Sequence, residues 1–302
     1  MNKANYHRSK RMSALDKWAQ HGVLEQRDRM PIESDFVERV TKNTRVFFRP
    51  SHLKCLESVS FQRELSYLVD AFDFLPERVD IAFDFVWKAF ELETKKCVRG
   101  STAARLQAIA PLVNRKVIAR LCHSMPVQAC EFLFKRLVSD ELSNKADPGL
   151  RKRIELIKDN NLEVLLEHMR TTYGSPSDND LRRKGAMFLK RVMNGETMEL
   201  NGYPRLNADS SLRAHILISL YLYTARNGRV HGDSFSPFLS SKAKIRTYTH
   251  PYFAFLSTYY LLLCAWQQRK EQVVINGDRE ILKSLDDNLE CAIRVFGSHW
   301  NK

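Results

Sequence analysis

Apolar residues recur at intervals of three and four along most of this chain, and this period constrains its fold more than any other feature. Between residues 79 and 90, one such stripe consists of Val79, Ala82, Phe83, Val86 and Phe90. An α-helix places residues with this spacing on one face, so the pattern predicts an amphipathic helix. Glycine, which sheets and tight hairpins require, makes up only 11 of 302 residues. We therefore expect an all-α protein.

Capping residues predict where several helices begin and end. Asp178 suits the N-terminal cap of one helix, and Asp209 or Ser210 suits that of another. Gly228 is expected to end the second of these helices, since glycine is the commonest C-terminal stop. Pro251 is expected to open a long apolar helix that reaches about residue 268.

Composition divides the chain into an extension and a body. Residues 1–55 are interpreted as a basic N-terminal extension, because residues 1–50 hold eleven Lys or Arg against six Asp or Glu. Residues 56–302 are expected to form one helical domain with an inserted basic helical segment at about residues 140–205. Asn201-Gly202, shortly before Pro204, indicates a small edge hairpin near the end of this segment.

Net charge, apolar stretches and cysteine usage indicate the class of partner and the cellular compartment. The formal net charge is +13, which favours polyanionic partners and RNA among them. The longest apolar stretch, residues 252–266, is too short to cross a bilayer, and no apolar run follows the basic N-terminus as a secretory signal requires. Six cysteines occur without a CxxC pair. These features predict a cytoplasmic protein with reduced thiols, no membrane partner and no metal site.

One segment combines residue types that suit RNA chemistry. Residues 221–233 read YLYTARNGRVHGD, so Arg226, Asn227 and His231 form an R-N-x-x-x-H pattern. Cleavage of RNA by its own 2′-OH needs a base, an acid and a cation beside the phosphate, and no metal or cofactor. Histidine serves as base or acid near neutral pH, and arginine grips phosphate oxygens. Asparagine can orient the imidazole or the phosphate through its amide. These three residues are the candidate catalytic residues.

This pattern at the end of one apolar helix and before another resembles the signature of the HEPN superfamily. Residues 75–90 also resemble an early helix of some HEPN-like proteins, and the two segments together cover about a third of the chain. The resemblance implies a HEPN-like helical bundle, here elaborated with extra helices. It further implies a metal-independent endoribonuclease that leaves a 2′,3′-cyclic phosphate and forms a homodimer with a composite site. A role as a toxin or in defence against phage, with an antitoxin or regulatory partner, is implied in the same way.

Further basic residues are candidates for binding the RNA backbone. Arg229, Lys242, Lys244 and Arg246 follow the motif closely and are assigned to substrate binding. Two more basic runs, at residues 151–153 and 182–184, are solvated helix faces unless they converge on one surface with others.

Several alternatives remain open at this point. Asp80 and Asp84 form either a solvated helix face or a carboxylate group that approaches His231. His250, next to Pro251, is expected near a helix start. The alternative function is a catalytically inactive HEPN-like module that binds nucleic acid or another protein. Phosphate-loop, dinucleotide-binding, zinc-protease and α/β-hydrolase signatures do not occur in the sequence, so those enzyme classes have no support.

Overall fold

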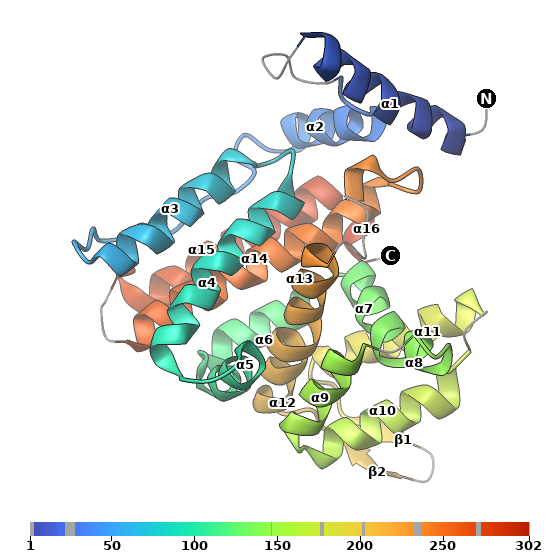
Figure 1. Ribbon diagram of the computed structural model, residues 1–302. Coiled ribbons are helices and arrows are strands. Elements are labelled where there is room, and N and C mark those ends of the chain that lie inside the picture. Colours follow the sequence, from blue (N-terminus) through green and yellow to red (C-terminus); the bar gives the residue numbers. More distant parts are fainter. Residues whose placement is uncertain are drawn as a thin grey trace.

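A computed structural model describes residues 3–21, 28–145, 147–175, 178–200, 203–231, 237–269 and 273–301. Within these ranges the protein consists of helices and one small two-stranded sheet, so the all-α prediction is confirmed (Figure 1). None of the helices in this part of the chain is both long enough and apolar enough to cross a bilayer.

The elements fall into three consecutive groups. The first group comprises α1 (Lys3–His21), α2 (Pro31–Asn43), α3 (Val59–Asp73), α4 (Val79–Cys97), α5 (Thr102–Ile109), α6 (Arg115–Ser124) and α7 (Val127–Phe134). The second comprises α8 (Asp140–Leu142), α9 (Pro148–Ile157), α10 (Asn160–Tyr173), α11 (Asn179–Met193), β1 (Met198–Leu200) and β2 (Tyr203–Leu206). The third comprises α12 (Ser210–His215), α13 (Tyr223–Val230), α14 (Ile245–Gln268), α15 (Gly277–Phe296) and α16 (Ser298–Asn301).

Four shorter stretches connect these helices. The 3-10 turns are η1 (Ala110–Leu112) and η4 (Pro237–Leu239). The stretches η2 (Lys135–Ser139) and η3 (Ile216–Leu222) are π-helical, with one extra residue in each hydrogen-bonded turn. η2 joins α7 to α8, and η3 joins α12 to α13.

Helix α4 lies in the centre of the core, packed between α3 and α14 (Figure 1). The apolar stripe predicted from its spacing is confirmed, because each of its five members is at most 1% exposed. Helix α14 is buried on nearly all sides, as expected for a helix that is apolar all round. The prediction that Pro251 opens this helix is wrong. The helix begins at Ile245, and Pro251 lies inside it, where its missing N–H costs one hydrogen bond.

The predicted caps of two helices are confirmed. The Asp178 carboxylate accepts hydrogen bonds from the first backbone N–H groups of α11, and Asp209 does the same for α12. The predicted stop at Gly228 is wrong, because α13 continues to Val230 and His231 is its C-terminal cap. Gly228 is not among the glycines with positive φ and therefore keeps helical backbone geometry.

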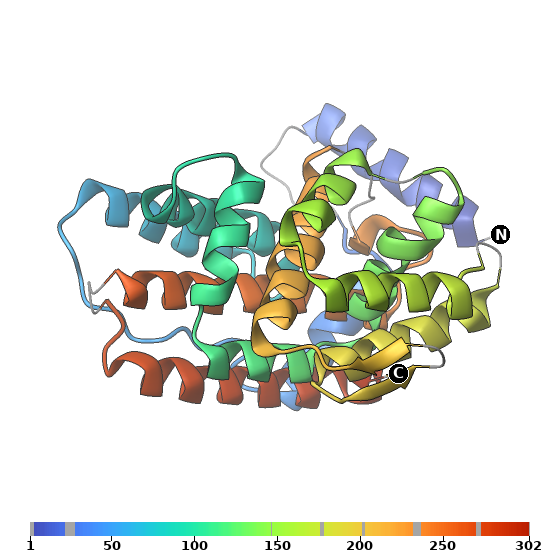
Figure 2. The same ribbon diagram turned by 90° about the horizontal axis from the view of Figure 1, so that it is seen from below.

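The N-terminal part of the chain packs on the same core as α14. Phe36 of α2 is fully buried and packs against Tyr248 of α14 with the two rings tilted and their centroids 4.2 Å apart. The segment that contains α9, α10, α11 and the hairpin lies beside α7 and α12, away from α3 (Figure 2). Strands β1 and β2 pair in antiparallel fashion, and the turn predicted at Asn201-Gly202 lies outside the described residues.

Candidate functional site

The R-N-x-x-x-H pattern occupies the last two turns of α13 and its cap. His231 is exposed, and no described side chain hydrogen-bonds to its imidazole. Asn227 is half-buried, and its amide oxygen accepts a hydrogen bond of 3.1 Å from the Arg226 guanidinium. The pattern therefore presents one imidazole that is free to meet a ligand.

Arg226 faces α4, where it meets a carboxylate that the sequence argument did not single out. Its Nη2 lies 3.6 Å from Oε2 of Glu91, and its side chain remains 26% exposed. The other oxygen of Glu91 accepts a 3.0 Å hydrogen bond from Thr102 and lies 3.4 Å from Nη2 of Arg105. Glu91 thereby ties α13, α4 and α5 together, while the exposed part of Arg226 keeps access to an outside phosphate.

Arg229, a predicted substrate-binding residue, instead pairs with two carboxylates of α4. Its Nε and Nη2 donate to Asp84 at 2.7 and 2.6 Å, and its Nη1 donates to Asp80 at 3.2 Å. Asp80 is fully buried and also accepts two hydrogen bonds of 3.1 Å from Arg78. Burial alone raises the pKa of Asp80, but Arg78 and Arg229 outweigh it and hold that pKa below its ordinary value.

These contacts bear on both alternatives for Asp80 and Asp84, a solvated helix face and a carboxylate group that approaches His231. Asp80 is not part of a solvated face, because its side chain has no exposed surface. Asp84 stays 31% exposed but makes its close contacts with Arg229, and no interaction between either carboxylate and His231 is found among the described residues. Both carboxylates contact Arg229, which lies within the motif segment, and thereby hold α13 against α4.

Helix geometry separates the cation from the imidazole within one chain. Successive residues turn by about 100°, so Arg226 and His231, five positions apart, project about 140° from each other. Arg226 and Arg229 share the face toward α4, whereas Asn227 and His231, one turn apart, share another face. One chain therefore offers the guanidinium and the imidazole on different sides of α13.

The π-helical stretch before α13 sets this orientation. Extra residues in its turns rotate all that follows relative to α12. Arg153 of α9 supports it, because its buried guanidinium donates to the Ser219 carbonyl at 3.0 Å and to the Thr224 hydroxyl at 2.7 Å. The same group lies over the Tyr223 ring, 4.7 Å from the centroid. The expectation that the run at residues 151–153 is a solvated face is thus wrong for Arg153, which is 3% exposed.

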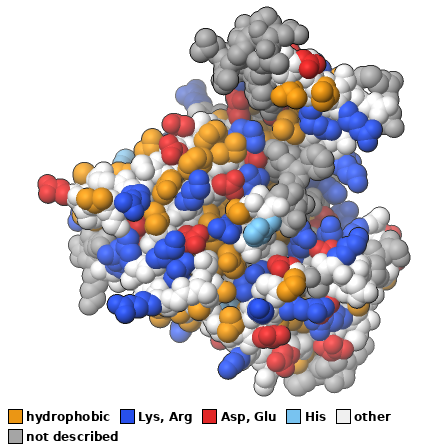
Figure 3. Space-filling model, in the orientation of Figure 1, with side chains coloured by type: hydrophobic (Ala, Val, Ile, Leu, Met, Phe, Trp, Pro, Cys, Tyr) orange, Lys and Arg blue, Asp and Glu red, His pale blue; other side chains and the backbone are white. Residues whose placement is uncertain are grey.

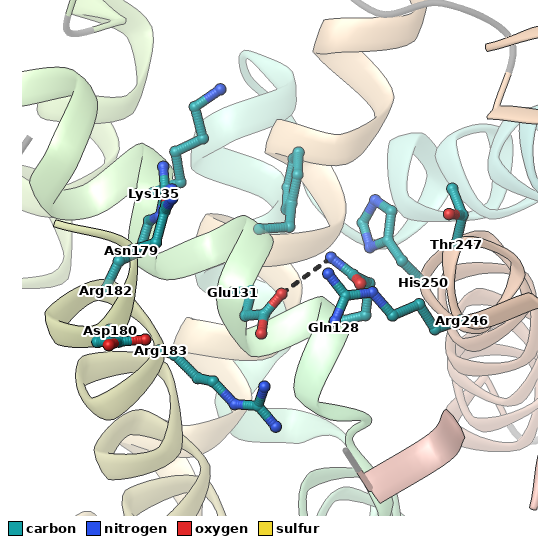
Figure 4. A pocket seen from close by; sticks show the side chains of 11 residues that line it. Gln128, Glu131, Lys135, Asn179, Asp180, Arg182, Arg183, Arg246, Thr247 and His250 are labelled. Carbon is teal, nitrogen blue, oxygen red and sulfur yellow. Dashed lines mark hydrogen bonds between the residues drawn. The ribbon is translucent and has the colours of Figure 1, made fainter. Parts of the chain in front are cut away.

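The remaining basic candidates lie at and before the start of α14. Lys242 and Lys244 are exposed in the turn that precedes the helix. Arg246, in its first turn, lines a cavity of about 590 Å³ between α7, α11 and α14 (Figure 4). We call this the α7–α11–α14 cavity; its lining consists of Gln128, Glu131, Phe132, Lys135, Asn179, Asp180, Arg182, Arg183, Arg246, Thr247 and His250.

One basic run therefore does converge with another. Arg182 and Arg183 of the run at residues 182–184 line the same cavity as Arg246, although more than sixty residues separate them in the chain. In Figure 4 the side chains of Arg183 and Arg246 extend toward each other from opposite sides, with Glu131 between them. Residues from two separate basic runs therefore meet at this cavity, as a phosphate-binding surface requires.

His250 was expected near a helix start but lies inside α14, in the wall of the cavity. Its Nδ1 is 2.9 Å from the Tyr221 hydroxyl, and its ring stacks on Phe132 with centroids 4.5 Å apart. Burial, together with the positive charges of Arg229 and Arg136, lowers the pKa of His250 to about 3. The imidazole is thus neutral at physiological pH, and its contact with Tyr221 of η3 links the cavity wall to the segment just before α13.

Three residues of the site, Glu91, Phe132 and Lys135, were not predicted from the sequence. Glu91 follows Asp80 and Asp84 by eleven and seven residues, so all three lie on one stripe of α4, and this spacing could have identified it. Phe132 and Lys135 carry no such signal, because only the packing of α7 against α11 and α14 brings them to the cavity.

The described residues contain no group of three or more His, Cys, Asp or Glu side chains that could hold a metal ion. Comparison of the chain with protein-family models, curated proteins and solved structures finds no match. Any functional assignment therefore has to rest on the residues and their geometry.

Proposed function

We propose that this protein is a HEPN-like, metal-independent endoribonuclease that cleaves RNA through attack of the ribose 2′-OH. The observation that supports this most directly is the exposed imidazole of His231, which no described side chain hydrogen-bonds, at the end of the helix that carries Arg226. The contact between Glu91 and Arg226 holds that guanidinium in place while leaving a quarter of its surface accessible. A fixed cation and an exposed imidazole suit phosphodiester chemistry when two chains bring them to one phosphate.

The reaction assigns one role to each group. A neutral imidazole takes the proton of the 2′-OH, and the resulting oxygen attacks the adjacent phosphorus. The Arg226 guanidinium stabilises the negative charge that grows on the phosphorane oxygens. A protonated imidazole then delivers a proton to the departing 5′ oxygen. The products are a 2′,3′-cyclic phosphate and a free 5′-hydroxyl.

Two copies of the chain are needed to supply these roles. One chain offers a single motif histidine, whereas the reaction uses one base and one acid. The angular separation of Arg226 and His231 on α13 also favours a site shared between two chains. We therefore propose a homodimer in which two motifs face one RNA strand, as the HEPN resemblance implies.

A second candidate function has its own supporting observation. The motif arginines are matched by carboxylates, Arg226 by Glu91 and Arg229 by Asp80 and Asp84. The cations that line the α7–α11–α14 cavity pair with no carboxylate among the described residues. This distribution fits a HEPN-like module that binds nucleic acid without cutting it.

The cellular setting is proposed on the resemblance and the charge alone. A cytoplasmic ribonuclease of this kind would serve as a toxin or as an effector of defence against phage. Its activity would then require restraint by an antitoxin or another regulatory partner.

The deciding experiment follows cleavage of end-labelled single-stranded RNA by the purified protein in EDTA. We expect His231→Ala and Arg226→Ala each to lower the rate by about 100-fold or more, since general acid–base catalysis contributes about that much. The exposed residues His123 and Arg63, which lie on α6 and α3, provide matched controls as His123→Ala and Arg63→Ala. Product ends with a 2′,3′-cyclic phosphate are expected. Undiminished cleavage by both motif variants would overturn the proposal, and RNA binding without cleavage by the wild type would favour the second candidate.

A further inference from the structure

The α7–α11–α14 cavity is lined by more cationic than anionic side chains. Four cationic side chains line it, namely Lys135, Arg182, Arg183 and Arg246, against the carboxylates of Glu131 and Asp180. None of these four cations forms an ion pair with any described residue, although Arg182 donates a hydrogen bond to the Asn179 amide. Such uncompensated cations, drawn from separate helices around one concavity, favour an anionic ligand.

The cations of the motif differ from those that line the cavity, because carboxylates lie against them. Arg226 and Arg229 lie opposite carboxylates of α4, and Arg136, just beyond the cavity, pairs with Asp140 at 3.0 Å. On the face of the molecule shown in Figure 3, acidic and basic side chains are interspersed instead of forming one broad patch. The cavity thus differs from the motif in offering cations that pair with no described carboxylate.

The rest of the lining suits a ligand with more than a phosphate. Phe132 and His250 form a stacked aromatic wall, on which a planar base can pack. Glu131 lies at the centre and accepts a 3.2 Å hydrogen bond from Gln128. A carboxylate there repels a simple inorganic anion but accepts hydrogen bonds from ribose hydroxyls or base amino groups. A cavity of about 590 Å³ is within the range of small-ligand pockets.

The cavity is connected to the motif through Arg136 and His250. The Arg136 guanidinium lies over the Phe132 ring, 5.6 Å from its centroid. Its Nη2 is also 3.9 Å from where a Cβ on Gly228 would stand, so the same side chain reaches α13. A strand held in the cavity would therefore lie close to the end of the helix that carries the motif.

We propose that the α7–α11–α14 cavity binds one nucleotide of a single-stranded RNA, with its phosphate held by Arg183 and Arg246 and its base against the aromatic wall of Phe132 and His250. The cavity is a binding subsite distinct from the motif and belongs in part to the inserted helical segment, through α11. Only the choice of an RNA strand over a free nucleotide rests on the proposed ribonuclease function. The nucleotide chemistry rests on the lining residues.

The test measures binding of a short 2′-O-methyl oligonucleotide by fluorescence anisotropy. This probe lacks the 2′-OH and cannot be cleaved, so binding is separated from catalysis. We expect the double variant Arg183→Gln/Arg246→Gln to bind at least about tenfold more weakly, because charge-assisted hydrogen bonds to phosphate are lost. The slope of log K against log salt should become shallower by about 0.7, which corresponds to one neutralised phosphate on a single strand.

Matched controls separate a local site from general attraction to the positive net charge. The double variant Arg63→Gln/Arg99→Gln removes the same charge from exposed positions in and near α3 and α4. It should leave the affinity within about twofold of wild type, since isolated exposed charges contribute little. Equal weakening by the two double variants would overturn the proposal.

Two further binding measurements identify the chemical groups of the ligand that the cavity recognises. AMP should displace the probe and adenosine should not, because the phosphate is the group that Arg183 and Arg246 hold; equal displacement by both would contradict the assignment. Glu131→Gln should weaken AMP relative to inorganic phosphate, whereas a site for a plain anion would gain affinity for both. The ratio of AMP affinity to oligonucleotide affinity then shows whether a free nucleotide or a strand is the better ligand.

The outcomes keep this inference apart from the proposed function. Loss of probe binding in Arg183→Gln/Arg246→Gln, with normal binding by His231→Ala, supports the cavity whether or not the wild type cleaves RNA. Unchanged binding in the cavity variant removes the subsite but leaves the motif assignment as it stands.

Discussion

Arg229 illustrates how a residue chosen for substrate binding is used inside the protein. Its guanidinium bridges Asp80, which has no exposed surface, and Asp84, which is partly exposed. Desolvating a carboxylate is costly, and the charges of Arg78 and Arg229 offset that cost at Asp80. The sequence shows two carboxylates one turn apart on α4 but not which cation they meet. That choice depends on how α13 approaches α4.

Replacement of this arginine gives a prediction about stability. We expect Arg229→Met to lower the free energy of unfolding by about 2 to 3 kcal/mol, because buried Asp80 then loses a cation that lies against it. The matched variant Arg183→Met removes an exposed cation that pairs with no described carboxylate and should change stability by less than about 0.5 kcal/mol. Urea unfolding followed by circular dichroism measures both. Equal losses would show that the bridge to Asp80 and Asp84 is not stabilising.

Among the elements, α13 is the helix whose end the sequence misplaces. Glycine commonly ends helices because it adopts positive φ without strain, but Gly228 has helical geometry and the helix continues past it. Alanine is favoured over glycine inside a helix by up to about 1 kcal/mol. Whether that gain is realised depends on what the added methyl group meets.

Two Gly→Ala variants therefore have opposite expected effects. Among the described residues, a Cβ at Gly228 would meet Arg136 Nη2 alone, at 3.9 Å, so Gly228→Ala should raise stability by about 0.5 to 1 kcal/mol. At Gly185 of α11 a Cβ would overlap the Phe134 ring of α7, so Gly185→Ala should lower stability by about 1 to 3 kcal/mol. Thermal and urea unfolding test both. A destabilised Gly228→Ala variant would contradict the continuous helix.

For the whole molecule, the proposed site is complete only when two chains meet. The contacts of Glu91, Asp80 and Asp84 fix α13 rigidly, so one chain cannot rotate Arg226 and His231 onto the same face without breaking them. A shared site makes the activity of each subunit depend on its neighbour, whereas two independent sites do not.

Mixing subunits tests this dependence. Wild-type protein and His231→Ala protein are combined in equal amounts under conditions that exchange subunits, and RNA cleavage is measured. If both imidazoles are required, only the wild-type dimers are active, and the mixture should keep about one quarter of the wild-type activity per dimer. Independent sites would keep about one half. Sedimentation of the wild type as a monomer would also contradict the shared site.

The helices follow from local properties of the chain, whereas the site follows from how they pack. Apolar spacing and capping side chains act within a few residues, so the stripe of α4 and the caps Asp178 and Asp209 were predictable. The π-helical turn before α13, the Glu91 contact with Arg226 and the meeting of Arg183 with Arg246 join residues far apart in the chain. Their partners depend on the angles between packed helices, which side-chain volumes across the whole core determine and no short pattern encodes.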